Sequence, residues 1–169
     1  MVLKKEVIIV DRKKALLDNF KCFDKLDEIK QKVFDGEDIY SVVASYIFNV
    51  SPNECREYNC DWTKSEEGKW RRDVAKYLCL NWASLDDIAT KYNVPNLHEL
   101  VVKAFPYTPY DEIDTDDELS VDCETIEDKA LNSYSFITLI RGYCLLAKYR
   151  VDMKDYSDLQ GYSYDENTK

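Results

Sequence analysis

One stretch of the sequence constrains the fold more than any other. Residues 66–83, EEGKWRRDVAKYLCLNWA, alternate polar and apolar side chains with the period of an α-helix. Lys69, Arg72 and Lys76 are spaced three and four positions apart, so they share one face of that helix. The pattern predicts a helix near the middle of the chain with a basic face beside apolar and aromatic positions.

Helix signals recur on both sides of this stretch. Thr63 with Glu66 is a candidate capping box before it, and Ser51-Pro52-Asn53-Glu54 combines an N-cap serine, a first-turn proline and a second capping box. Apolar residues also repeat at helical spacing over 12–34, 38–48, 84–93, 96–105 and 130–151. Residues 6–10, EVIIV, predict a short strand, and 107–124 at most a second one. The predicted fold class is mainly α: a single helical domain with a short N-terminal strand or small sheet.

Charge and composition exclude several classes of protein. The formal net charge is −10, which disfavours general nucleic-acid binding because the field of the protein repels phosphate. The sequence has no apolar run long enough to span a bilayer, and the apolar run near the N-terminus is too short for a signal peptide. Six cysteines with no CxxC pair and a single histidine supply a zinc site poorly. We therefore expect a cytoplasmic protein without membrane contact, with free thiols and with no cofactor or metal.

The character of the chain changes at Pro106. Residues 111–128 contain ten acids and no lysine or arginine, and these ten equal the formal negative excess of the whole chain. Either the segment is a solvated acidic connection, or it is an acidic surface that binds a partner protein. The candidate partner-binding residues are Asp111, Glu112, Asp114, Asp116, Asp117 and Glu118. The chain then divides into a helical region (1–106), an acidic connection (107–128), a packing helix of the same domain (129–153) and a flexible tail (154–169).

Several segments also resemble a known family when taken in order. A β-branched strand runs into Asp11, GEDIYSVVASYIFNV follows at 36–50, SPNECREYNCDWTKSEEGK at 51–69, and Arg72 with Lys76 forms an R-x-x-x-K motif. This order is similar to that of family A DNA polymerases in the form of their phage members, over roughly residues 1–106. The resemblance implies a phage origin, a fold like the palm edge and fingers of a polymerase, and a vestigial phosphate or nucleotide site at Lys69, Arg72 and Lys76.

The departures from that family concern its catalytic residues. RKKALLD follows Asp11 in place of the serine, glutamate and arginine of the first motif. Leu80, Asn81 and Ser84 stand where the family has an aromatic residue, a glycine and a tyrosine, and the motif with the second metal-binding aspartate is not recognisable. Two-metal phosphoryl transfer needs more than one aspartate. We therefore expect no polymerase activity and no metal site, with Asp11 vestigial at best or simply a helix cap.

Two functions from different classes remain open. The first is a non-catalytic, phage-derived binding protein or inhibitor that occupies a nucleic-acid-processing enzyme, such as a host defence nuclease or the replication machinery, through its acidic surface. The alternative is a residual nucleotide- or DNA-binding accessory module of a polymerase, which would use Arg72 and Lys76. A homo-oligomer is also open. Trp62, Trp70 and Trp82 could form a stacking surface, although Trp70 and Trp82 are better explained as core or interface residues.

Overall fold

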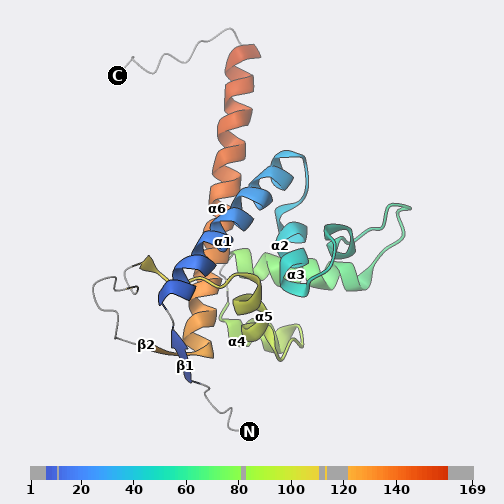
Figure 1. Cartoon of the computed structure of the whole chain (residues 1–169). Helices are drawn as coiled ribbons and strands as arrows, with labels where there is room; N and C mark the ends of the chain where they lie inside the picture. Colours follow the sequence, from blue (N-terminus) through green and yellow to red (C-terminus); the bar gives the residue numbers. More distant parts are fainter. Residues whose placement is uncertain (1–6, 11, 81–82, 111–112, 114–121, 160–169) are drawn as a thin grey trace, which may run out of the picture.

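The computed structural model describes residues 7–10, 12–80, 83–110, 113 and 122–159. The described chain is mainly helical, as the sequence predicts (Figure 1). Its elements are β1 (Val7–Val10), α1 (Arg12–Phe34), α2 (Ile39–Phe48), the 3-10 helix η1 (Pro52–Cys55), α3 (Glu66–Leu80), α4 (Leu85–Lys91), α5 (Leu97–Ala104), β2 (Asp122–Thr125) and α6 (Ile126–Leu159). No helix in the described part combines the length and the apolar character that crossing a membrane requires.

The two strands join distant parts of the chain. β1 pairs with β2 in antiparallel orientation, with Val7 opposite Thr125 and Val10 opposite Asp122. β2 leads directly into α6. The pairing therefore holds the start of α6 beside the start of α1, as Figure 1 shows.

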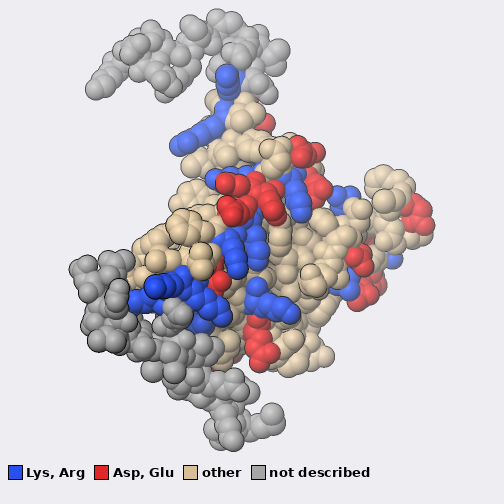
Figure 2. Space-filling view, viewed as in Figure 1, with Lys and Arg blue, Asp and Glu red and all other residues tan. Residues whose placement is uncertain are grey.

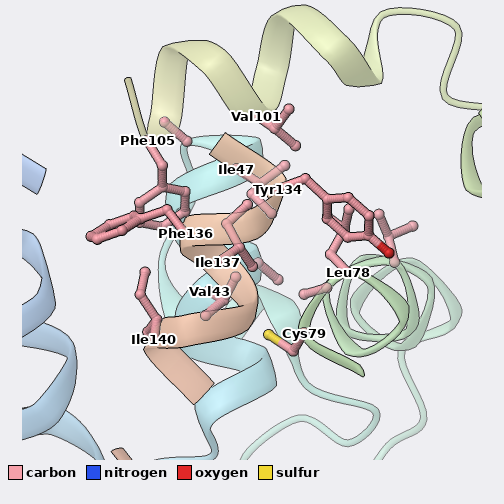
Figure 3. Packing of buried hydrophobic residues seen from close by; sticks show 14 of the residues in the cluster. Val43, Ile47, Leu78, Cys79, Val101, Phe105, Tyr134, Phe136, Ile137 and Ile140 are labelled. Atoms are coloured by element: carbon pink, nitrogen blue, oxygen red, sulfur yellow. The ribbon is translucent and has the colours of Figure 1, made fainter. Parts of the chain in front are cut away.

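The core is built around the first half of α6. Phe136, Ile137 and Ile140 of α6 point toward side chains of α2, α3 and α5 (Figure 3). The neighbours labelled there are Val43 and Ile47 from α2, Leu78 and Cys79 from α3, and Val101 and Phe105 from α5 and its C-cap. Burial of this apolar surface is the main force that keeps the four helices together.

The helix starts follow local chemistry, with one correction. The Ser51 N–H donates to the Glu54 carboxylate at 2.9 Å, as the predicted capping box requires, and the Ser84 hydroxyl caps α4. The prediction that Thr63 caps the central helix is wrong. Ser65 accepts the Gly68 N–H at 3.0 Å instead, because the Thr63 hydroxyl is bonded to Asp61 at 2.6 Å.

Helix α6 is longer than predicted at both ends. It covers Ile126–Leu159 rather than 130–151, so the first residues of the predicted tail, 154–159, continue the helix. Its second half extends well beyond the helices that surround its first half (Figure 1). The side chains described from Leu145 to Lys154 are exposed except Ala147, which is half-buried. The apolar pattern marks only the part of a helix that packs against other elements. The prediction therefore ended too early, because the last residues of α6 are helical without being buried.

Candidate functional site

The three cations predicted as a phosphate site do not form a free basic face. Arg72 binds the carboxylate of Asp38 through two nitrogens, with Nε–Oδ2 at 2.9 Å and Nη2–Oδ1 at 3.2 Å. Lys69 forms an ion pair with Asp73 at 2.7 Å. Lys76 is exposed on the same helix. Two of the three charges are therefore compensated within the fold, which leaves little attraction for a phosphate group.

Arg72 belongs to a polar cluster that joins three helices. Asp38 is the N-cap of α2 and accepts the Ser41 N–H at 2.9 Å. The Arg72 guanidinium lies 5.3 Å from the centre of the Tyr40 ring, and Tyr40 in turn accepts a hydrogen bond from Arg141 of α6 at 3.1 Å. This geometry fastens α2 to α3 and α6 and gives Arg72 a structural role.

The cluster predicts a specific acid dependence of stability. Burial tends to raise the pKa of Asp38, but hydrogen bonds from Arg72 and Ser41 outweigh it and hold the pKa below the ordinary 3.8. A depressed carboxyl pKa contributes stability above the ordinary value, and this contribution is lost as the pH falls through the pKa of the folded state. We expect Asp38→Asn to cost about 1 kcal/mol at pH 6, a modest value because the side chain is partly exposed, and less at pH 3.

Urea unfolding of both proteins between pH 3 and pH 6 checks this prediction. The other acidic groups titrate in both proteins, so their effect cancels in the difference. A difference between the two proteins that does not change with pH would show that the Asp38 charge does not stabilise the fold.

The other predicted site residues provide less evidence for a function. Asp11 and the six acidic residues from Asp111 to Glu118 lie outside the described residues. His98 lies 3.3 Å from Asp86 on neighbouring helices. Across the part of the chain that the structure describes, no group of three histidine, cysteine or acidic side chains is placed to hold a metal ion.

The cysteines whose side chains the structure describes are free thiols, as predicted: Cys22, Cys55, Cys60, Cys79 and Cys144. Burial raises the pKa of Cys22 and Cys79 to about 12 and that of Cys55 and Cys144 to about 11. These four buried thiols are therefore protonated at neutral pH and poor nucleophiles.

The tryptophans separate into different roles. Trp70 donates its indole N–H to the Tyr92 carbonyl at 2.8 Å and packs against Phe48, with ring centres 5.1 Å apart, so it is part of the interior. Trp82 lies outside the described residues. Trp62 is 82% exposed and has a φ of 66°, a left-handed conformation that is rare for a bulky side chain. A large apolar side chain that is both solvated and strained is the most unusual feature of the surface.

Trp62 stands at the tip of a closed hairpin, residues 56–65, which we call the Trp62 hairpin. Asn59 N–H donates to Thr63 O at 2.8 Å, Ser65 N–H to Glu57 O at 2.7 Å, and Trp62 N–H to Asn59 O at 2.9 Å. Within the loop, the Asp61 carboxylate accepts both the N–H and the hydroxyl of Thr63, at 3.0 and 2.6 Å. These bonds fix the tip, so Trp62 is presented by an ordered loop.

The base of the hairpin is fixed against α3. A Cβ at Gly68 would lie 2.1 Å from the Arg56 carbonyl oxygen, so only glycine permits the close approach of the two segments. Arg71 donates to the Glu54 carbonyl at 2.9 Å across the same junction. The hairpin therefore projects from the body at a defined angle (Figure 1).

The surface around Trp62 is hollowed and carries charges of both signs. Between 54 and 67 the sequence has five carboxylates and two cations, and Figure 2 shows acidic and basic side chains along this projection at the right of the view. Beside the indole is a cavity of about 410 Å³, lined by Asn53, Arg56, Glu57, Tyr58, Asn59, Cys60 and Trp62. An exposed aromatic side chain beside a hollow is typical of a surface that recognises another protein.

No family model, no curated protein and no solved structure matches this chain. Function must therefore be inferred from the residues themselves. The basic helix was predicted from the sequence, and Trp62 was considered as a stacking residue. The sequence did not indicate that Asp38 pairs with Arg72 or that residues 56–65 form a closed hairpin. The hairpin could have been predicted from Asn59, Asp61 and Thr63, since side chains of these types stabilise tight turns.

Proposed function

We propose that this chain is a non-catalytic binding protein of phage origin that acts in the host cytoplasm by occupying a nucleic-acid-processing enzyme. The observation that carries the proposal is Trp62, exposed in a left-handed conformation at the tip of an ordered hairpin. The contact would use this hairpin together with the acidic residues 111–118. A defence nuclease or a component of the replication machinery is the class of target.

The energetic argument starts from the cost of Trp62 in the free protein. A left-handed conformation costs a non-glycine residue roughly 1–2 kcal/mol, and the solvated indole gains nothing from the core. Burial in a partner pocket would recover the apolar contribution, and tryptophan is among the residues that most often dominate a protein interface. A feature that is unfavourable in isolation and rigidly held supports a role in recognition.

Charge selects the kind of partner. Acidic residues outnumber basic ones in the chain as a whole, which has a formal net charge of −10, and most of that excess lies at 111–128. Near the hairpin the excess is smaller, because Lys64 pairs with Glu66 at 3.0 Å and Arg71 with Glu67 at 2.6 Å. Such a surface is attracted to the positively charged channel of an enzyme that binds DNA or RNA. The accessory-module alternative receives less support, because Arg72 and Lys69 already have carboxylate partners.

The family resemblance belongs to the same proposal. The segments that carry it, 36–50 and 51–76, correspond to α2, η1, the Trp62 hairpin and α3, which are consecutive in the chain and joined by the Arg72–Asp38 pair. We propose that a polymerase-fingers-like framework has been kept while two of its phosphate-binding cations, Lys69 and Arg72, came to pair with carboxylates of the same chain. The Trp62 hairpin and the acidic residues 111–118 would then supply the present function.

We expect Trp62→Ala to abolish partner binding while leaving the fold intact. Loss of a central tryptophan anchor typically costs 2 kcal/mol or more, that is, about 30-fold or more in affinity. The test is to capture a host enzyme on the immobilised protein, purify that enzyme and measure its affinity for each variant, with duplex DNA as competitor. Neutralising Asp114, Asp116, Asp117 and Glu118 together should weaken both the affinity and its salt dependence.

Phe20→Ala is the matched control, because Phe20 is also an exposed aromatic side chain but lies on α1, outside the hairpin. Equal affinities for the Trp62→Ala and Phe20→Ala proteins would exclude the hairpin as the contact. Binding that duplex DNA fails to displace would exclude a nucleic-acid channel as the target surface.

A further inference from the structure

A cavity of about 490 Å³ opens on the surface between α1, the C-terminal end of α2 and α5. Its lining includes three lysines, Lys25, Lys32 and Lys103, and no carboxylate, and we call it the lysine cavity. The whole chain has 33 acids against 23 lysines and arginines, so a hollow with cations and no acid is the opposite of what its composition predicts. The volume is in the range of sites that bind small molecules.

The three ammonium groups are brought together by the packing of α1 against α2 and α5. Lys25 and Lys32 are seven positions apart, so they lie about two turns apart on the same face of α1. The Lys25 ammonium donates to the Ala104 carbonyl at 2.5 Å, and Lys103 is the residue before Ala104 in α5. The Lys32 ammonium lies 5.2 Å from the centre of the Tyr46 ring of α2. Charges from two helices therefore meet at one hollow.

The lysine cavity keeps most of this positive charge. Each ion pair between described residues uses other cations, so none of the three lysines is paired with a carboxylate there. Glu28 accepts the Tyr46 hydroxyl at 2.7 Å and offsets part of the charge, although it is not in the lining. Lys25 and Lys32 are half-buried, where water screens like charges less than at a fully solvated surface. An anion in the cavity would supply the missing counter-charge.

The helix ends explain only part of this arrangement. Lys32 is in the last turn of α1 and Lys103 in the last turn of α5, where a cation is favourable beside the partial negative charge of the helix end. That effect accounts for one lysine at each helix end. It gives no reason for a hollow between these lysines, or for a lining without a single acid.

The rest of the lining indicates what kind of anion fits. Half of the lining residues are apolar: Ile47, Phe48, Val50, Pro52, Leu100 and Ala104. A matching ligand therefore has an anionic group for the lysines and an apolar or aromatic part for this wall. A phosphate monoester has close to two negative charges at neutral pH and three acceptor oxygens, whereas a carboxylate has one charge. Three ammonium groups suit the phosphate better.

We propose that the lysine cavity binds a small organic phosphate, that is, a phosphate monoester with an apolar or aromatic part, such as a nucleotide. Lys25, Lys32 and Lys103 hold the phosphate oxygens, and the apolar wall contacts the remainder of the molecule. The lining contains no residue of α3 and none of the residues that line the cavity beside Trp62. The site is therefore independent of the proposed partner contact, and either can fail without the other.

An NMR titration of the full chain with phenyl phosphate and with AMP tests the proposal, because it reports both the affinity and the position of the ligand. Phenyl phosphate is a minimal probe with both parts, and AMP shows whether a nucleotide is accepted. The amide signals of Asn49, Val50 and Leu100, which line the cavity, are expected to shift. Phenol and adenosine lack the phosphate and should bind at least about tenfold more weakly than the matching phosphate.

The lysine variants show whether the ammonium groups hold the phosphate. Lys32→Gln and Lys103→Gln should each raise the dissociation constant about tenfold, because each removes a charge-assisted hydrogen bond. Lys76→Gln is the matched control, since Lys76 is an exposed lysine of α3 outside the cavity, and it should leave the affinity unchanged. Circular dichroism shows whether each variant keeps its helices.

Three results would overturn the proposal. The first is that neither phenyl phosphate nor AMP binds at concentrations up to about 10 mM. The second is that phenol or adenosine binds as tightly as its phosphate, because the lysines would then have no part in recognition. The third is that Lys76→Gln weakens binding as much as Lys32→Gln and Lys103→Gln do, or that both of these leave it unchanged, which would place the ligand elsewhere.

Discussion

Phe136→Ala is expected to lower the free energy of unfolding by about 3–5 kcal/mol, the range for removing a large aromatic side chain from a packed core. Phe136 is almost fully buried where α6 meets α1 and α5. Its ring is stacked on Tyr107 at 4.7 Å and meets Phe23 edge-on at 5.8 Å. The loss combines the transfer of a phenyl group to water with a cavity that three neighbouring rings cannot fill.

Thermal and urea unfolding measure the effect, and a decrease of roughly 10 °C in the melting temperature is expected for a chain of this size. Leu139→Ala, three positions along the same helix but on the free face, should change the stability of the folded monomer by less than about 0.5 kcal/mol. Similar losses for the two variants would mean that α6 is not divided into a core face and a free face.

The helical elements were predictable because their signals are local. Capping residues such as Ser51 and Ser84 and the apolar repeat of 12–34 depend on neighbours a few positions away, and α1 covers the predicted range. The face of α1 that is buried was harder to predict. Phe20 is 61% exposed, whereas the polar Asn19 is fully buried, because a hydrogen-bonded contact with a distant segment sets the rotation of the helix.

The candidate site shows the same limit. Sequence spacing placed Lys69, Arg72 and Lys76 on one helical face, but the charge that compensates Arg72 is Asp38, 34 positions earlier. Its position near the Arg72 side chain depends on how α2 packs against α3, which no local pattern contains. The exposure of Trp62 is equally a product of tertiary structure, since it follows from a hairpin fastened at Gly68 and Arg71.

The length of α6 illustrates a different limit. Apolar periodicity marks the part of a helix that is buried, and it placed the end of this helix at 151 rather than at Leu159. Tyr143, Leu146 and Tyr149, which lie within the predicted packing helix, are exposed. A sequence cannot distinguish a face that packs inside its own chain from one that stays exposed, because both can be apolar at the same spacing.

Asn19→Leu is expected to lower the free energy of unfolding by about 3 kcal/mol, although leucine is more apolar and similar in size. The Asn19 side chain donates to the Thr108 carbonyl at 2.6 Å and accepts the Thr108 N–H at 2.9 Å, and both residues are buried. Leucine can make neither bond. Two buried backbone groups would lose their partners, at about 1–3 kcal/mol each, partly offset by the added apolar contact.

Amide hydrogen exchange separates this mechanism from a general loss of packing. Asn19→Leu should increase the exchange rate of the Thr108 N–H by more than the global loss of stability explains, because the substitution removes the Asn19 oxygen that accepts this N–H. Lys21→Leu, an exposed position on the same helix, is the control and should leave Thr108 protected. If Thr108 stays protected in the Asn19→Leu protein, the contact does not hold the segment after α5 against α1, and the rotation of α1 must have another cause.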